Sequence, residues 1–358
     1  MSGTDPAKSQ LGAEASVKEA PSSPLLEIRG LTLGFGDGDY LPVRELGLSL
    51  DKGEVAGLVG ESGSGKSLTA FGLMGLLPYG ASVKAGEILF EGEDVLGLPA
   101  KKRRELCGAK MGMIFQEPLS ALNPVLTIGD QVSEIFRIRL GMRKNEAKER
   151  SLALLARVGL PNPKAAYESY PHRFSGGMRQ RVVIAMALAL DPALVVADEP
   201  TTALDPTIAL QIIKLLRDLT KERGTSVLFI THNLKLLAGL AEKVFVMYAG
   251  LVLEETRDGL RDPLHPYTVG LLEALPPDPS ELVALGPGAQ GAPGPGLGSR
   301  KAMVPIPGTA PQPSDRLPGC PFAPRCGERF EPCEKSLPGL FSLQGGRRVR
   351  CFKYGQPC

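Results

Sequence analysis

The chain has 358 residues, of which 43% are hydrophobic and 22% are charged, and its formal net charge is +2. This composition is typical of a globular protein, and the length suggests about two domains. The small net charge gives no argument for a nucleic-acid partner, which would favour a strongly basic chain.

Residues 1–24 are small and polar, and they predict a disordered tail. They lack the apolar stretch of a secretion signal. No part of the chain reaches the roughly 20 uninterrupted apolar residues that a membrane-spanning helix needs. We therefore expect a cytosolic protein, in which clustered cysteines more often bind metal or do redox chemistry than form disulfides.

The next segments predict strands that alternate with helices. Residues 25–35 predict a strand, and the apolar run at 54–60, which ends in glycine, predicts a buried one. Residues 66–77 predict a helix that Pro78 and Gly80 stop. Residues 87–95 predict an edge strand followed by a turn.

The second half of the pattern continues the alternation. Residues 124–170 predict helical structure, with an amphipathic segment at 143–160, and residues 193–200 and 226–232 predict further buried strands. Strands alternating with helices favour a mostly parallel α/β sheet. The Gly/Pro-rich run at 285–300 predicts a flexible linker, and residues 301–358 beyond it predict a separate, small, cysteine-rich C-terminal unit.

A glycine-rich loop lies between the strand at 54–60 and the following helix. Its sequence, GESGSGKS, fits G-x-x-x-x-G-K-S and has the strand before it and the helix after it that a phosphate-binding loop requires. Lys66 would reach the β- and γ-phosphates and Ser67 would bind Mg²⁺. The alternative, a chance glycine loop, is disfavoured by this context. The predicted ATP- and phosphate-binding residues are Gly60, Glu61, Ser62, Gly63, Ser64, Gly65, Lys66 and Ser67.

Two acidic residues lie at the end of the buried strand predicted at 193–200. Asp198 can hold Mg²⁺, and Glu199 can polarise a water for in-line attack on the γ-phosphate. An isolated Asp-Glu pair is usually an exposed acidic pair. Its place on a buried strand, about 130 residues after the phosphate-binding loop, favours the catalytic interpretation.

The stretch FSGGMRQR (174–181), together with these two motifs, resembles the signature of ATP-binding-cassette (ABC) ATPases. The resemblance implies a P-loop NTPase cassette over 25–262: a RecA-like core, an antiparallel β-subdomain and a helical subdomain at about 120–175. It also implies that the signature contacts ATP bound to a partner subunit. The signature residues are Ser175, Gly176, Gly177, Met178 and Gln180.

Other family marks follow in order. Gln116 resembles the Q-loop residue, which acts in catalysis and at Mg²⁺, and Asp205 resembles the D-loop aspartate. His232 matches the switch histidine that contacts the γ-phosphate, although alone it would be read as a packing histidine at a strand end. Phe35 is the preferred aromatic for stacking adenine, and Tyr40 is the alternative.

Residues 115–132, 170–207, 263–276 and 306–326 look like the oligopeptide/dipeptide branch, whose members also import nickel and related solutes; 263–284 would be its extension. The resemblance implies an importer ATPase on the cytoplasmic face of the inner membrane. Its partners would be a second, non-identical cassette, two permease subunits and a solute-binding protein, with no nucleic acid. A soluble ABC ATPase of DNA repair or translation, and an iron–sulfur protein that binds nucleotide, are alternatives.

Four cysteines near the C-terminus have spacings of five, six and seventeen intervening residues. Structural zinc sites usually contain a closer pair, whereas four thiolates on an irregular loop suit a 4Fe–4S cluster. The resemblance also implies such a cluster; zinc and no metal are the alternatives. Cys358 could replace the last ligand, and Cys107 is expected to be a buried apolar residue. The predicted ligands are Cys320, Cys326, Cys333 and Cys351.

Overall fold

The structure is a computed structural model that describes residues 23–38, 40–202, 204–237, 239–275, 304–312, 314–315 and 317–355. The linker predicted at 285–300 and Cys358 lie outside these ranges, as does all but the end of the tail predicted at 1–24. No helix in the described ranges is long and apolar enough to cross a membrane.

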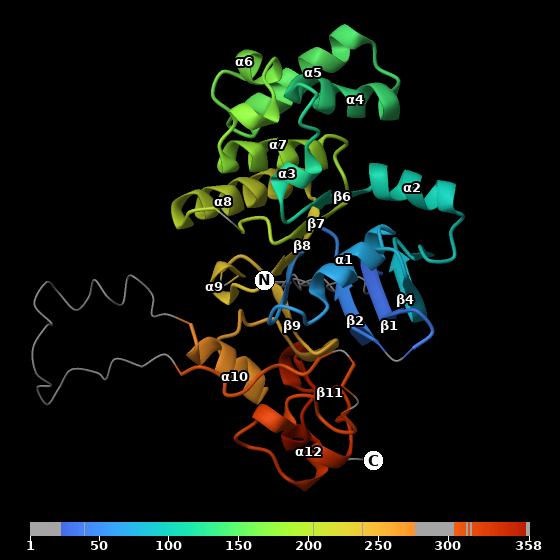
Figure 1. Cartoon of the computed structure of the whole chain (residues 1–358), viewed down its shortest axis with the longest axis vertical. Coiled ribbons are helices and arrows are strands. Elements are labelled where there is room, and N and C mark those ends of the chain that lie inside the picture. The colour runs from blue at the N-terminus through green and yellow to red at the C-terminus, as the bar shows by residue number, and fades with distance from the viewer. Residues whose placement is uncertain are drawn as a thin grey trace, which may run out of the picture.

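An eight-stranded sheet forms the centre of the molecule (Figure 1). The five strands β9, β3, β8, β7 and β6 run parallel, as the alternating sequence pattern predicted, and the other three are antiparallel. In spatial order the strands are β11 (Phe341–Ser342), β12 (Arg348–Val349), β10 (Leu251–Thr256), β9 (Lys243–Tyr248), β3 (Val55–Val59), β8 (Ser226–Thr231), β7 (Leu194–Asp198) and β6 (Met111–Ile114).

The central strands β7, β8 and β9 are buried along their whole length and mostly apolar, because both of their faces are covered. Successive residues point to opposite faces. In β7, Leu194 and Val196 belong to one hydrophobic core, whereas Val195 and Ala197 belong to the other. The carboxyl ends of β3 and β7 are therefore fixed by packing on both sides.

A smaller antiparallel sheet and one helix share the first of these cores. The sheet has the order β2 (Val43–Leu50), β1 (Leu26–Phe35), β4 (Ala81–Phe90) and β5 (Glu93–Asp94), and the helix is α1 (Lys66–Met74). The strand predicted at 87–95 is not an edge strand throughout, because β4 pairs with β1 along its length and the short β5 forms the edge.

Helices cover the other core and form the layer at the top of Figure 1. The predicted helical stretch at 124–170 is divided into three helices, because Gly141 and Gly159 adopt positive φ between them. The helices between residues 100 and 237 are α2 (Ala100–Ala109), α3 (Pro118–Ala121), α4 (Ile128–Leu140), α5 (Lys144–Arg157), α6 (Pro163–Tyr167), η1 (Pro171–Arg173), α7 (Gly176–Leu188), α8 (Pro206–Arg223) and α9 (Leu234–Leu237).

The C-terminal residues are joined to the large sheet and lie at the bottom of Figure 1. Val349 of β12 pairs with Glu254 of β10, and Phe322 and Phe352 belong to the same core as the helical layer. The structure therefore gives no support to the prediction of a separate C-terminal unit. The remaining elements are α10 (Pro266–Glu273), η2 (Ala323–Arg325), α12 (Glu331–Lys335), η3 (Gln344–Gly346) and η4 (Phe352–Tyr354).

Candidate functional site

A cleft of about 440 Å³ lies against the glycine-rich loop, at the carboxyl ends of β3 and β7. One wall is residues 61–68, which comprise most of the predicted phosphate-binding loop and the start of α1. The other walls come from five separate parts of the chain, and their residues are Phe35, Tyr40, Pro42, Gln116, Glu199, Tyr248, Ala249, Ala310, Pro311 and Gln312.

Two glycines let the loop pack tightly against neighbouring backbone. A Cβ on Gly60 would lie 2.0 Å from the carbonyl oxygen of Met247. Gly65 has a φ of 104°, and a Cβ there would lie 2.4 Å from the carbonyl oxygen of Pro42. No other residue fits either position without moving these neighbours. The loop leads directly into α1, whose first N–H groups form an anion-binding helix end.

Lys66 is buried at the base of the cleft. Its Nζ donates to the carbonyl oxygens of Gly60 and Glu61, both at 2.9 Å. Burial lowers the pKa of Lys66, and the carboxylates of Glu199, Asp198 and Glu61 oppose that shift. A buried ammonium group whose hydrogen-bond partners are neutral carbonyl and hydroxyl oxygens favours an anionic ligand, because phosphate oxygens would supply the compensating charge.

Ser67 and Asp198 meet on the other side of Lys66. The Oγ of Ser67 donates to Oδ1 of Asp198 at 3.1 Å, which joins the loop to the end of β7. Burial raises the pKa of Asp198, and the hydrogen bond from Ser67 offsets only part of this shift. A hydroxyl and a carboxylate are oxygen donors of the kind that Mg²⁺ binds, so these two side chains fit a magnesium site.

Glu199 is held from three sides. Its Oε2 accepts from Thr202 Oγ1 at 2.7 Å and from Gln116 Nε2 at 3.1 Å, and its Oε1 lies 3.0 Å from Nδ1 of His232. Burial opposes ionisation, but the hydrogen bonds from His232 and Thr202 outweigh it and hold the pKa of Glu199 below its usual value. The carboxylate is therefore ionised and fixed in direction, as a general base must be.

The two aromatic candidates for the adenine platform lie together. Phe35 and Tyr40 both line the cleft, and their ring centroids are 5.5 Å apart in an edge-to-face arrangement. The structure brings both to the site and does not choose between them.

The signature residues do not line this cleft. Ser175 caps α7, where its Oγ accepts from the N–H of Met178 at 3.4 Å, and Gly176 and Gly177 form the first turn. Gln180 is buried in α7. Asp205 caps α8 by accepting from the N–H of Ile208 at 3.0 Å. The signature and the cleft are thus two distinct surfaces of the same chain.

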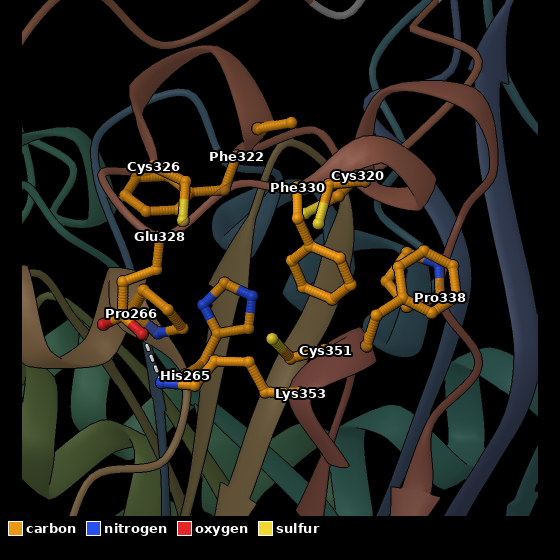
Figure 2. Close-up of a pocket in the computed structure, with 13 residues that line it drawn as sticks. His265, Pro266, Cys320, Phe322, Cys326, Glu328, Phe330, Pro338, Cys351 and Lys353 are labelled. Carbon is orange, nitrogen blue, oxygen red and sulfur yellow. Dashed lines mark hydrogen bonds and ion pairs between the residues drawn. The ribbon is translucent and has the colours of Figure 1, made fainter. Parts of the chain in front are cut away.

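The predicted iron–sulfur cluster is wrong for the part of the chain that the structure describes. The four cysteines line one cavity together with His265, Phe322 and Phe330, and Figure 2 shows Cys320, Cys326 and Cys351 around it. This cavity measures only about 20 Å³. That is room for one water and not for a cluster. No three His, Cys, Asp or Glu side chains among the described residues are placed to hold a metal ion.

The cysteine side chains are packed within the fold. Burial raises the pKa of Cys320 to about 11 and also raises the pKa values of Cys326 and Cys351. Cys320 and Cys333 pack in the hydrophobic core, and the N–H of Cys320 donates to the carbonyl oxygen of Cys333 at 2.8 Å.

Several residues at the site were missed from sequence. Thr202 is not predictable as a site residue, because a threonine after an acidic pair carries no signal by itself. Tyr248, Gln312 and Arg325 come from parts of the chain that no motif linked to the loop. The arginine lies in a segment that had been assigned to a separate unit, and only its contacts reveal its connection to the loop.

Comparisons with known proteins agree with this geometry. Residues 43–202 match the family described as ABC transporter, and residues 253–288 and 289–333 match the oligopeptide/dipeptide transporter C-terminal region. The oligopeptide transport ATP-binding protein OppD of Salmonella typhimurium is 43% identical over 96% of this chain and 98% of its own length. The oligopeptide transport ATP-binding protein AppD of Bacillus subtilis is 42% identical over 93% of this chain and 97% of its own length.

Solved structures match over the cassette. A dimeric ATP-binding cassette in a post-hydrolysis state, bound to ADP and Pi, has a TM-score of 0.58 at 28% identity, covering 65% of this chain and 98% of that one. The cbiO1 protein of Clostridium perfringens is part of an ABC transporter complex. It has a TM-score of 0.57 at 27% identity, covering 66% of this chain and 89% of that one.

Proposed function

The chain belongs to the ABC transporter ATP-binding proteins that carry the oligopeptide/dipeptide C-terminal region, and we propose that it hydrolyses ATP to drive the import of short peptides. The relatives in Salmonella typhimurium and Bacillus subtilis are named for oligopeptide transport, and one in Haemophilus influenzae, 42% identical over 91% of this chain, for dipeptide transport. Both transporter regions of the family match this sequence.

The phosphate end of ATP would bind at the glycine-rich loop. Lys66 would exchange its bonds to loop carbonyls for bonds to the β- and γ-phosphates. Mg²⁺ would be held by Ser67 and Asp198, with Gln116 nearby, and when bound it would neutralise charge on the phosphates. Phe35 or Tyr40 would stack on adenine.

The observation that carries the proposal is the fixed carboxylate of Glu199 in the same cleft as Lys66. An ionised carboxylate held by three side chains suits the orientation of an attacking water. His232, which is hydrogen-bonded to that carboxylate, would also contact the γ-phosphate. Gln116 would couple the binding of ATP to movement of the helices that follow it.

Each nucleotide-binding site would be completed by residues of a second cassette. The N-terminal end of α7, with Ser175 as its cap, would contact ATP held by the partner's loop, because helix N-termini bind phosphate. Its position outside the chain's own cleft supports this arrangement. We propose a non-identical homologue as that partner, with Asp205 at the interface.

The permease subunits would dock in a groove of about 900 Å³ beside the helical layer. The groove is lined by apolar side chains such as Ile135 and Ile138 and by three arginines, Arg103, Arg104 and Arg139. Phe115, which precedes Gln116, also lines it. A short cytoplasmic permease helix with an apolar face and acidic ends would fit this chemistry. The chain would then lie peripherally on the cytoplasmic face of the inner membrane, in a complex served by a solute-binding protein.

Two variants test the ATPase assignment. Glu199→Gln is expected to reduce hydrolysis by roughly 10²-fold or more while ATP still binds, because the base is lost and the loop is not. Lys66→Ala is expected to weaken ATP binding itself. Hydrolysis by Glu199→Gln at a near wild-type rate would refute the role of Glu199.

The transport assignment is tested by gentle purification of the chain from its native membranes. Mass spectrometry is expected to identify two permease subunits and a second cassette, together with a solute-binding protein that carries bound peptide. A bound metal ion or glycoside in that protein, and no peptide, would refute the peptide substrate.

A further inference from the structure

Glu61 places a negative charge inside the phosphate-binding loop. This position of the loop motif accepts any residue, so the motif itself does not require an acid. A carboxylate beside a polyphosphate would weaken ATP binding by repulsion unless a cation offset it. The structure provides such a cation from 264 residues further along the chain: Nη1 of Arg325 lies 2.8 Å from Oε2 of Glu61.

This ion pair is shielded from water, which makes it stronger than an exposed pair. The side chain of Arg325 is 7% exposed and that of Glu61 is 26% exposed. Burial alone would lower the pKa of Arg325, but the hydrogen bonds to Glu61 and Tyr248 outweigh it and raise that pKa. The guanidinium is therefore a permanent charge at this position.

Arg325 also connects the loop to two other parts of the cleft. Its Nη1 lies 3.2 Å from the hydroxyl of Tyr248, whose residue lines the cleft, and its Nε donates to the carbonyl oxygen of Pro307 at 2.9 Å. Pro307 lies three residues before Ala310, the first of three consecutive C-terminal residues that line the cleft. One guanidinium thus bridges the loop, β9 and the 304–312 segment.

The hydroxyl of Tyr267 supports the same loop residue from its backbone side. It accepts from the N–H of Glu61 at 2.9 Å. The rings of Tyr248, Tyr267 and Phe322 pack together, with centroids 4.5 to 5.5 Å apart. The place of η2, which carries Arg325, is therefore fixed relative to the loop by ring packing as well as by charge.

From these contacts we propose that Arg325 is a positioning residue of the nucleotide site: it neutralises Glu61 and holds residues 310–312 as a wall of the cleft, so that affinity for polyphosphate depends on the C-terminal segment. The inference rests on the proposed ATPase function. It assigns to the segment after the linker a part in nucleotide binding.

The test measures the dissociation constants of ATP, ADP and AMP for the purified full-length chain. Arg325→Gln leaves the Glu61 carboxylate uncompensated, so ATP binding is expected to weaken about tenfold, with a smaller loss for ADP and least for AMP. Combining it with Glu61→Gln removes both charges and is expected to recover the part of the ATP affinity that is lost to repulsion, leaving the smaller loss that comes from the wall no longer being held. The ATP affinity of Arg325→Lys is expected to lie between those of Arg325→Gln and the wild type.

A matched control is Arg329→Gln in the same segment. Arg329 pairs with Glu334 at 3.6 Å on the exposed surface, where both side chains are more than half exposed. This variant is expected to bind ATP as the wild type does. Glu61→Gln alone keeps the arginine and removes the carboxylate that opposes its charge beside the phosphates, so it is expected to bind ATP more tightly than the wild type.

Three results would overturn the proposal. They are an equal loss of ATP and AMP binding in Arg325→Gln, no recovery in the double variant, and weaker ATP binding in Glu61→Gln alone. A wild-type chain that binds no ATP would instead refute the proposed function, so the two failures are distinguishable.

Discussion

The backbone of Glu199 adopts a conformation that residues with a side chain usually avoid. Its φ is 44°, in the left-handed region, and its N–H donates to the carbonyl oxygen of Ile230 at 2.8 Å. Such a conformation costs on the order of 1 kcal/mol and persists only where the surroundings enforce it. Here β8 holds the backbone while Gln116, Thr202 and His232 hold the carboxylate, so the side chain is aimed before ATP arrives.

Thr202 gives a prediction at this scale. Thr202→Val removes one hydrogen-bond donor to Glu199 with almost no change of volume. The pKa of Glu199 is lowered in the folded protein partly by that donor, so in the variant it should rise. Hydrolysis needs the ionised form, so the acidic limb of its pH–rate profile should move to higher pH.

The control is Thr202→Ser, which keeps the hydroxyl and should keep the wild-type profile. The measurement is steady-state ATPase rate between about pH 4 and pH 8, which brackets the usual carboxyl range. An unshifted acidic limb in Thr202→Val would show that the hydroxyl does not tune Glu199.

The sequence was informative about residues whose chemistry is written in short motifs. Lys66, Ser67, Asp198 and Glu199 are predicted site residues because a phosphate-binding loop and an acidic pair at a strand end can be recognised as short motifs. The hydrogen bond from Thr202 to Glu199 and the ion pair between Arg325 and Glu61 were not predictable. They depend on which distant segments the fold brings together, and a single threonine or arginine carries no spacing signal.

At the scale of elements, the C-terminal strands extend the large sheet. Val349 of β12 is fully buried and pairs with Glu254 of β10, and Phe341 of β11 pairs with Val349 on its other side. This pairing was not predictable from the sequence, because two-residue strands are too short to show alternation. The Gly/Pro-rich run before them suggested a boundary instead.

This pairing predicts that the C-terminal region contributes to the stability of the cassette. Val349→Asp would bury an unpaired carboxylate beside Glu254, at an expected cost of about 3 kcal/mol or more in the free energy of unfolding. Urea unfolding, followed by circular dichroism, is expected to show a lower midpoint for the main transition.

Ser342→Asp is the control, because Ser342 is exposed and pairs with Arg348 in the same short strands. It should leave the midpoint within about 0.5 kcal/mol of the wild type. A Val349→Asp variant whose main transition is unchanged, with only a separate small transition lost, would restore the interpretation of the C-terminal region as an independent unit.

The cysteines show how the same residues can support different interpretations at different scales. Their spacing on an irregular loop favoured an iron–sulfur cluster, and the fold does bring all four around one cavity. The cavity between them is too small for a cluster. The spacing of the cysteines along the chain does not determine the volume of the cavity that forms between them in the fold.

At the scale of the whole molecule, we propose that the chain carries two halves of a nucleotide site, which lie on different surfaces. The loop and Glu199 line the cleft, whereas Ser175 at the start of α7 does not. The isolated chain should therefore hydrolyse ATP slowly. Its rate should rise more steeply than linearly with concentration if it pairs with itself, or only on addition of a related cassette.

Light scattering alongside the ATPase assay checks this prediction. Full activity from a chain whose mass remains that of a monomer would contradict a shared site.

The most direct test of the account is ATP-driven peptide uptake by the complex purified with its native partners and reconstituted in lipid vesicles. The account predicts that vesicles with the wild-type chain accumulate a labelled oligopeptide when ATP is supplied, and that Glu199→Gln abolishes accumulation while the complex remains assembled. Equal uptake by the two complexes, or ATP hydrolysis by the wild type without any peptide uptake, would contradict it.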